Sequence, residues 1–134
     1  MRRGRSGLPS AAVARSILIV DDNPAYGRLT ELLLRDALDV THEVRHATTL
    51  RAALDEISAR PADCLLLDLT LPDSEGLGSL ERLREVDEHV PIVIVSGRSD
   101  PGLADEALAR GAAGFVVKGD EREQLGVAVA AALA

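Results

Sequence analysis

Four apolar residues run directly into two acids in the stretch Ile17-Leu18-Ile19-Val20-Asp21-Asp22. The same arrangement, a short apolar run that ends in a polar residue, recurs in Leu65-Leu66-Leu67-Asp68, Ile92-Val93-Ile94-Val95-Ser96 and Phe115-Val116-Val117-Lys118. Short runs of Val, Ile and Leu separated by helical stretches are typical of buried strands in a parallel sheet. Ligands of an open α/β sheet bind just beyond the carboxyl ends of its strands. The pattern therefore predicts a functional site at that edge.

The composition favours one globular domain of 134 residues. A net charge of −7 disfavours direct binding to nucleic acid, and no apolar stretch is long enough to span a membrane. The single cysteine, Cys64, lies in an apolar run and has no metal-ligand spacing with the three histidines. We therefore expect a cytoplasmic protein without a zinc site, and without nucleic-acid or membrane contacts.

Strands and helices alternate along the chain after a basic start, so we expect a loose tail over residues 1–15 and one domain over 16–134. The expected strands lie at about 16–21, 42–47, up to Asp68, 91–95 and 114–117. The expected helices begin at Asn23-Pro24, cover about 49–59 and 77–86, run from Asp100-Pro101 to Gly111, and fill 120–134. This alternation predicts an α/β fold, a doubly wound parallel sheet of five βα units with helices on both faces.

Two features refine this arrangement. The strand at 42–47 is polar, which suits a sheet edge. In the helix after Asn23-Pro24 we expect an apolar stripe to face the core, made of Leu29, Leu32, Leu33 and Leu38.

Three of the strand-end residues are acids: Asp21, Asp22 and Asp68. Like charges this close are costly unless a cation neutralises them, and an all-oxygen ligand set suits Mg²⁺. Two other interpretations remain open. The adjacent pair could be favoured by a helix dipole, and Asp68 could bond its own loop backbone.

A carboxylate at the end of a strand can also act as a nucleophile toward phosphorus, which would make Asp68 a phosphoryl acceptor. Phosphoryl transfer is helped chiefly by cations and donors placed around the phosphoryl oxygens. Lys118 and Ser96 offer an ammonium and a hydroxyl at the same edge of the predicted sheet.

From Ser16 onward the chain resembles the receiver domain of two-component response regulators. The resemblance rests on the acidic pair, on Asp68-Leu69-Thr70-Leu71-Pro72-Asp73, on Ser96-Gly97 and on Gly111-Ala112-Ala113-Gly114-Phe115-Val116-Val117-Lys118. It implies a flavodoxin-like three-layer sandwich with the strand order 2-1-3-4-5. It also implies that Asp68 accepts a phosphoryl group from a histidine kinase or phosphotransfer protein. Such a domain assists its own phosphoryl transfer and hydrolysis and is otherwise not an enzyme.

The resemblance further implies a ligand set for Mg²⁺: Asp22, Asp68 and the carbonyl of Thr70 directly, with Asp21 acting through water. Ser96 and Lys118 would each bind a phosphoryl oxygen.

Phe115 matches the switch aromatic of the family. One departure is that Lys118 precedes Gly119, where the family usually has a proline after a cis peptide.

The segment from Gly126 to Ala134 has no charged or polar side chain, so we expect the last helix to dock onto another surface. In the receiver family, output commonly uses the face formed by the fourth helix, strand 114–117 and helix 120–134. A second copy, a partner or an attached output domain would then cover that face; the alternative is an Ala-rich helix end that frays in solvent.

Two alternatives remain. A degenerate receiver would serve as an unphosphorylated docking module. A phosphatase of the haloacid-dehalogenase type also uses an Asp nucleophile, but its acidic pair comes last in the chain, and Asp68-Leu69-Thr70 lacks its Asp-x-Asp motif.

Overall fold

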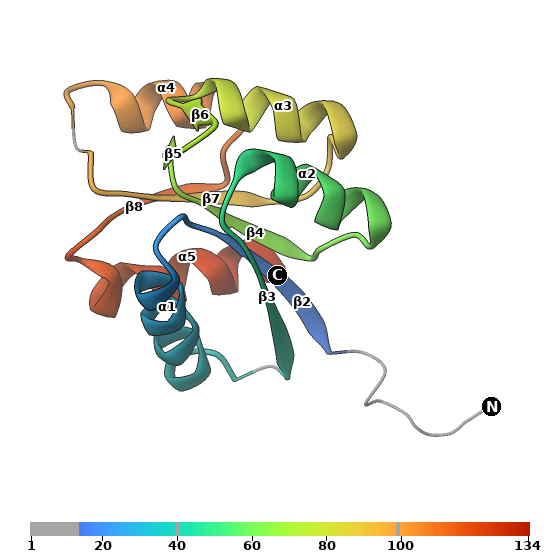
Figure 1. The fold of residues 1–134 in the computed structure, drawn as a ribbon. Helices are drawn as coiled ribbons and strands as arrows, with labels where there is room; N and C mark the ends of the chain where they lie inside the picture. Colours follow the sequence, from blue (N-terminus) through green and yellow to red (C-terminus); the bar gives the residue numbers. More distant parts are fainter. Residues whose placement is uncertain (1–13, 40, 99) are drawn as a thin grey trace.

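The computed structural model describes residues 14–39, 41–98 and 100–134, which form one parallel sheet between two layers of helices (Figure 1). The sheet consists of β2 (Arg15–Val20), β3 (His42–Ala47), β4 (Cys64–Leu67), β7 (Ile92–Ser96) and β8 (Gly114–Val117). The helices are α1 (Pro24–Ala37), α2 (Leu50–Ala59), α3 (Gly78–Val86), α4 (Leu103–Ala109) and α5 (Glu121–Leu133). A small antiparallel hairpin of β5 (Thr70–Leu71) and β6 (Ser74–Glu75), which was not predicted, follows β4.

The order of the strands in the sheet is β3-β2-β4-β7-β8, and every neighbouring pair is parallel. In chain order this is 2-1-3-4-5, so the predicted fold class and strand order are confirmed. The polar strand β3 lies at an edge, also as predicted. Its Arg45 donates to the carbonyls of Arg60 and Pro61 and pairs with Glu56, which ties the edge strand to the end of α2.

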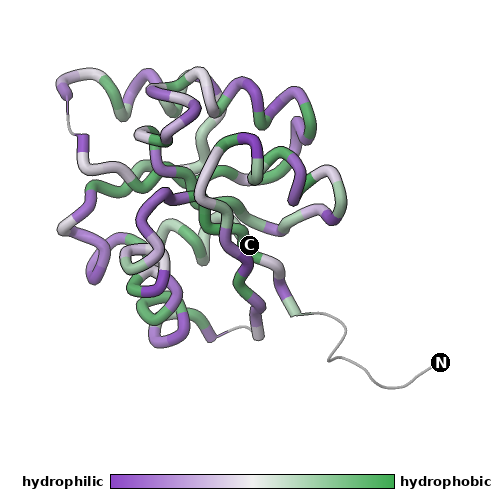
Figure 2. Tube along the Cα trace, in the orientation of Figure 1, coloured by the Kyte–Doolittle hydropathy of each residue, from purple (hydrophilic) through white to green (hydrophobic). Residues whose placement is uncertain are grey.

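Two apolar cores lie on the two faces of the sheet. On one face, alternate strand residues such as Leu18, Leu65 and Ile94 pack under α2, α3 and α4. On the other face, residues such as Ile19, Leu66 and Val95 pack against α1 and α5. The hydropathy of the chain follows this division, since the central strands are the most continuously hydrophobic segments (Figure 2). Burial on both faces explains why these strands are unbroken apolar runs.

The predicted apolar stripe of α1 is wrong at Leu29 and Leu32, whereas Leu33 and Leu38 are partly buried against the core as expected. Leu29 and Leu32 are 44% and 40% exposed. The buried residues of the helix are instead Gly27, Thr30 and Leu34. A Cβ at Gly27 would lie 3.2 Å from Nδ1 of His46, a tight contact, so the helix packs close to the edge strand at this position. Thr30 is tolerated inside because its hydroxyl donates to the carbonyl of Tyr26.

The helices α1 and α5 lie side by side on the same face of the sheet (Figure 1). They meet at Gly126, where an added Cβ would lie 2.6 Å from the Cβ of Ala37. Contact at that distance leaves no room for a side chain at position 126.

Most boundaries lie within one residue of the sequence prediction, and the start of the fourth helix differs most. The fourth helix begins at Leu103, after Gly102 in the left-handed region (φ 81°), and not at Asp100-Pro101. Residues 1–13 of the predicted tail lie outside the described residues, whereas Arg15 already belongs to β2. Within the described ranges, none of the helices has the length and apolar character needed to cross a membrane.

Candidate functional site

Three carboxylates meet at the carboxyl ends of β2 and β4. The two strands are neighbours, with Val20 paired to Leu67, so Asp21 and Asp68 follow them side by side. One oxygen each from Asp21, Asp22 and Asp68 lie within 4.8 Å of one another. Asp21 and Asp68 are only 8% and 5% exposed, whereas Asp22 faces solvent. This oxygen-only group, open on the Asp22 side, fits a hard divalent cation.

Lys118, at the end of β8, reaches this group. Its Nζ lies 3.0 Å from Oδ2 of Asp21 and 3.0 Å from Oδ2 of Asp68. Burial by itself lowers the pKa of Lys118, but the hydrogen bonds to Asp21 and Asp68 and their charges outweigh it, so the pKa is raised. The side chain therefore remains a cation between the two carboxylates at neutral pH.

Tyr26 in the first turn of α1 is part of the site and was missed by the sequence reasoning. Its ring centroid lies 4.2 Å from Nζ of Lys118, a cation–π contact. Its hydroxyl is buried and has no hydrogen-bond partner among the described residues. The one available signal was composition, since Tyr26 and Phe115 are the chain's two aromatic residues.

Backbone amides fix the orientation of the two buried carboxylates. The N–H of Thr70 donates to Oδ1 of Asp68 at 3.0 Å, and the N–H of Asn23 donates to Oδ1 of Asp21 at 2.9 Å. Asp68 therefore does bond its own loop, as the simpler interpretation expected, while its second oxygen faces Lys118. Each carboxylate has one oxygen held by the backbone and one that faces the ammonium.

Ser96 and Phe115 lie close to this edge on β7 and β8. Ser96 is completely buried, and its Oγ accepts a hydrogen bond from the N–H of Arg98 at 3.1 Å. Phe115 packs against the core under α2, α3 and α4. It also lines a pocket of about 250 Å³ with Val117 and the start of α4. The ring of Phe115 thus has open space beside it on the α4 side.

The segment after Lys118 departs from the family pattern without disturbing the lysine. Within the described residues no peptide bond is cis. Gly119 has a φ of 110°, a conformation that favours glycine, and its N–H donates to Oε1 of Glu121 at 2.6 Å.

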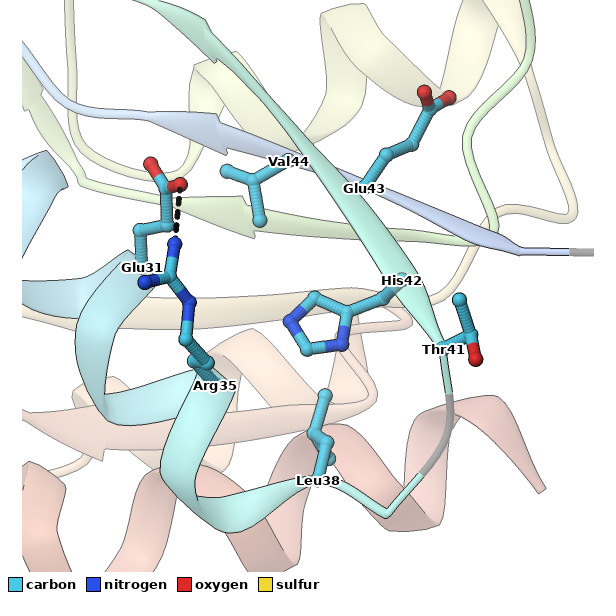
Figure 3. A pocket seen from close by; sticks show the side chains of 7 residues that line it. All are labelled: Glu31, Arg35, Leu38, Thr41, His42, Glu43 and Val44. Carbon is cyan, nitrogen blue, oxygen red and sulfur yellow. Dashed lines mark ion pairs between the residues drawn. The ribbon is translucent and has the colours of Figure 1, made fainter.

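A separate pocket of about 400 Å³ lies between α1 and β3 (Figure 3). It is lined by Glu31, Arg35, Leu38, Thr41, His42, Glu43 and Val44. Because β3 begins at His42, this pocket lies toward the amino ends of the strands. None of the predicted site residues lines it, so it is not part of the candidate site.

Comparison with known proteins identifies the family. Residues 17–130 match the response regulator receiver domain. The chain is 34% identical over 110 residues to the glycerol metabolism activator of Pseudomonas putida, covering 81% of this chain and 49% of that protein. The chain belongs to the response regulator receiver domain family. It spans about half the length of the curated relatives that it matches. Family membership sets aside the haloacid-dehalogenase alternative.

Solved structures agree with this assignment. The receiver domain of NtrX from Brucella abortus is 31% identical, with a TM-score of 0.77 and coverage of 87% of this chain and 97% of that one. A response regulator protein from Burkholderia pseudomallei is 25% identical, with a TM-score of 0.71 and coverage of 85% and 65%. That structure is described as containing a phosphorylated aspartic acid, a calcium ion and citrate.

Proposed function

We propose that this receiver domain accepts a phosphoryl group on Asp68 in a Mg²⁺-dependent reaction. The observation that carries the proposal is the ammonium of Lys118, placed 3.0 Å from oxygens of both Asp68 and Asp21, with Asp22 beside them. An anion bound at Asp68 would meet a cation on one side and a metal-binding acidic group on the other. The phosphorylated aspartic acid of the Burkholderia relative supports the same chemistry here.

The transfer step forms one bond and breaks one. A carboxylate oxygen of Asp68 attacks the phosphorus of a phosphohistidine on the donor protein, and the P–N bond breaks with its electron pair returning to the imidazole nitrogen. Lys118 stabilises the charge that gathers on the phosphoryl oxygens. A separate hydrolysis restores the resting state: water attacks the phosphorus, the P–O bond to Asp68 breaks with its electron pair returning to the carboxylate, and inorganic phosphate leaves.

The residues present fit Mg²⁺. Asp22, Asp68 and the carbonyl of Thr70 would hold the ion, with Asp21 acting through water. When bound, the ion would neutralise the acidic group and the phosphoryl oxygens. Asp21 is already engaged by Lys118 and by the N–H of Asn23, which suits it to a less direct part in binding.

The donor we propose is a histidine kinase or a phosphotransfer protein in the cytoplasm, and the domain turns over no separate substrate. Phosphorylation would rearrange Ser96 and Phe115 and so change the face formed by α4, β8 and α5, for which the open space beside Phe115 leaves room. On α5, Leu125, Val129 and Leu133 pack inward, whereas Val127 is 72% exposed. We propose that a second copy or an attached output domain covers this outer face.

Phosphorylation of the wild-type protein tests the proposal. With acetyl phosphate and Mg²⁺, intact mass spectrometry should show a single added phosphoryl group, and a chelator of divalent cations should prevent it. Beryllofluoride with Mg²⁺ should bind as a phosphoryl mimic. A folded protein that neither takes the group nor binds the mimic would be a degenerate receiver that acts only by docking.

Removal of the exposed acid should weaken metal binding. Loss of even an outer partner of a metal ligand costs about 10–100-fold in affinity. We expect Asp22→Ala to raise the Kd for Mg²⁺ at least about tenfold, since the carboxylate removed is a direct ligand. Asp21→Ala should cost less. The exposed Asp36 on α1 provides a charge control, because Asp36→Ala removes an acid outside the site. A Kd for Asp22→Ala equal to that of the control would contradict the ligand assignment.

A further inference from the structure

The hairpin β5–β6 contains the Thr70 carbonyl, and few hydrogen bonds within the hairpin stabilise it. Thr70 pairs with Glu75 and Leu71 with Ser74, and the N–H of Gly76 donates to the carbonyl of Leu69. A hairpin with two-residue strands is at best marginally stable by itself. Its position must therefore be set by contacts with the rest of the domain.

Asp73, at the tip of this hairpin, makes such a contact with α2. Its Oδ1 accepts the N–H of Leu50 at 2.8 Å, and its Oδ2 accepts the N–H of Arg51 at 2.9 Å. These two amides open α2 and have no partner within the helix. The Thr49 side chain accepts the N–H of Ala52, so the two side chains cap the helix together. The amides of Arg51 and Leu50 lower the pKa of Asp73, which keeps the carboxylate charged at neutral pH.

We infer that Asp73 is a positioning residue that couples the metal and phosphoryl site to the amino end of α2. The connection between α2 and the site consists of Asp73, the hairpin and Thr70. Asp73 fixes the tip of the hairpin on α2, and the base of the same hairpin supplies the Thr70 N–H that orients Asp68. The Thr70 carbonyl is the ligand assigned above, so this inference rests on the proposed function. Displacing the tip would move both groups of Thr70 relative to Asp68.

Coupling of this kind is reciprocal. If the Asp73 contact favours the hairpin position that binds Mg²⁺, then binding Mg²⁺ must favour the Asp73 contact. Occupancy of the site should therefore stabilise the first turn of α2. That helix lies outside the α4, β8 and α5 face, so the domain would carry a second region that responds to the site.

Glu75 provides a matched control. It is an exposed acid on the same hairpin, and it makes no side-chain hydrogen bond or ion pair with the described residues. Asp73→Ala and Glu75→Ala each remove one negative charge from near the site, but only the first removes the contact with α2. A difference between the two variants therefore measures the contact and not the charge.

The first measurement is the Mg²⁺ affinity in the presence of beryllofluoride. We expect Asp73→Ala to raise the Kd about tenfold, as loss of a partner that orients a metal ligand does. Asp73→Asn, which keeps one acceptor oxygen, should fall between Asp73→Ala and wild type. Glu75→Ala should stay close to wild type. Equal affinities for Asp73→Ala and Glu75→Ala would overturn the inference.

The second measurement is hydrogen exchange of the Leu50 and Arg51 amides, which a purely structural cap would not link to the ligand. In the wild type, Mg²⁺ with beryllofluoride should slow exchange at both amides. In Asp73→Ala, exchange should be fast and independent of the ligand. Wild-type amides that do not respond, in a protein that binds the ligand, overturn the inference even if Asp73→Ala fails to fold. If the wild type bound neither Mg²⁺ nor beryllofluoride, the proposed function itself would be wrong, and with it the inference.

Discussion

Asp68→Asn should take up no phosphoryl group from acetyl phosphate under conditions in which the wild type is fully modified. The substitution preserves the size of the side chain, and its carbonyl oxygen can still accept the N–H of Thr70. It replaces a carboxylate nucleophile with an amide, which forms no acyl phosphate. Intact mass spectrometry with Mg²⁺ measures the loss directly. Asp36→Asn on the exposed side of α1 should be modified like the wild type.

The neighbouring acids make this a demanding test. Asp21 and Asp22 lie within reach of the same site, so each is a candidate acceptor if the assignment to Asp68 is wrong. One stoichiometric phosphoryl group on Asp68→Asn would show that another acid is the acceptor. Peptide mapping of the product would then identify it.

Lys118→Met should slow phosphorylation by at least about 100-fold, the cost of losing one donor that stabilises charge in a transition state. The variant keeps a long apolar side chain against Tyr26 but removes the cation from between Asp21 and Asp68. The two buried carboxylates then repel each other, and the phosphoryl oxygens lose their ammonium partner. The rate constant of modification by acetyl phosphate at saturating Mg²⁺ measures the effect.

Arg122→Met on the exposed side of α5 is the control, because it removes one positive charge outside the site. Its rate should match that of the wild type. A rate for Lys118→Met within about twofold of this control would mean that the ammonium does not act on the phosphoryl group. Circular dichroism of both variants separates such a result from unfolding.

The strands and the acidic group could be predicted because their signals are local. An apolar run that is buried on both faces predicts a strand whichever side each residue faces, so Ile17-Leu18-Ile19-Val20 indicated β2 correctly. The grouping of the acids could be predicted too, because a parallel arrangement brings the carboxyl end of every strand to one edge of the sheet. That edge holds Asp21, Asp68 and Lys118 in contact.

The remaining features depend on contacts between distant segments, which no local pattern encodes. The buried face of α1 includes Gly27 and Thr30, which a hydrophobic pattern does not select, whereas Leu29 and Leu32 are exposed. Likewise, the ring of Tyr26 on Lys118 joins residues from α1 and the end of β8. The contact of Asp73 with α2 was missed for the same reason.

The close contact of Gly126 with Ala37 means that α1 connects the site to α5. The helix starts at the site, where Tyr26 lies on Lys118, and its last residue touches the middle of α5. Its 14 residues span about 21 Å, so one continuous helix connects these two points. Because position 126 has no side chain, the two helices lie very close there, and we expect a displacement of α1 at its Tyr26 end to move α5 as well. A shift of Lys118 toward a phosphoryl group would therefore affect α5 through α1 as well as through β8.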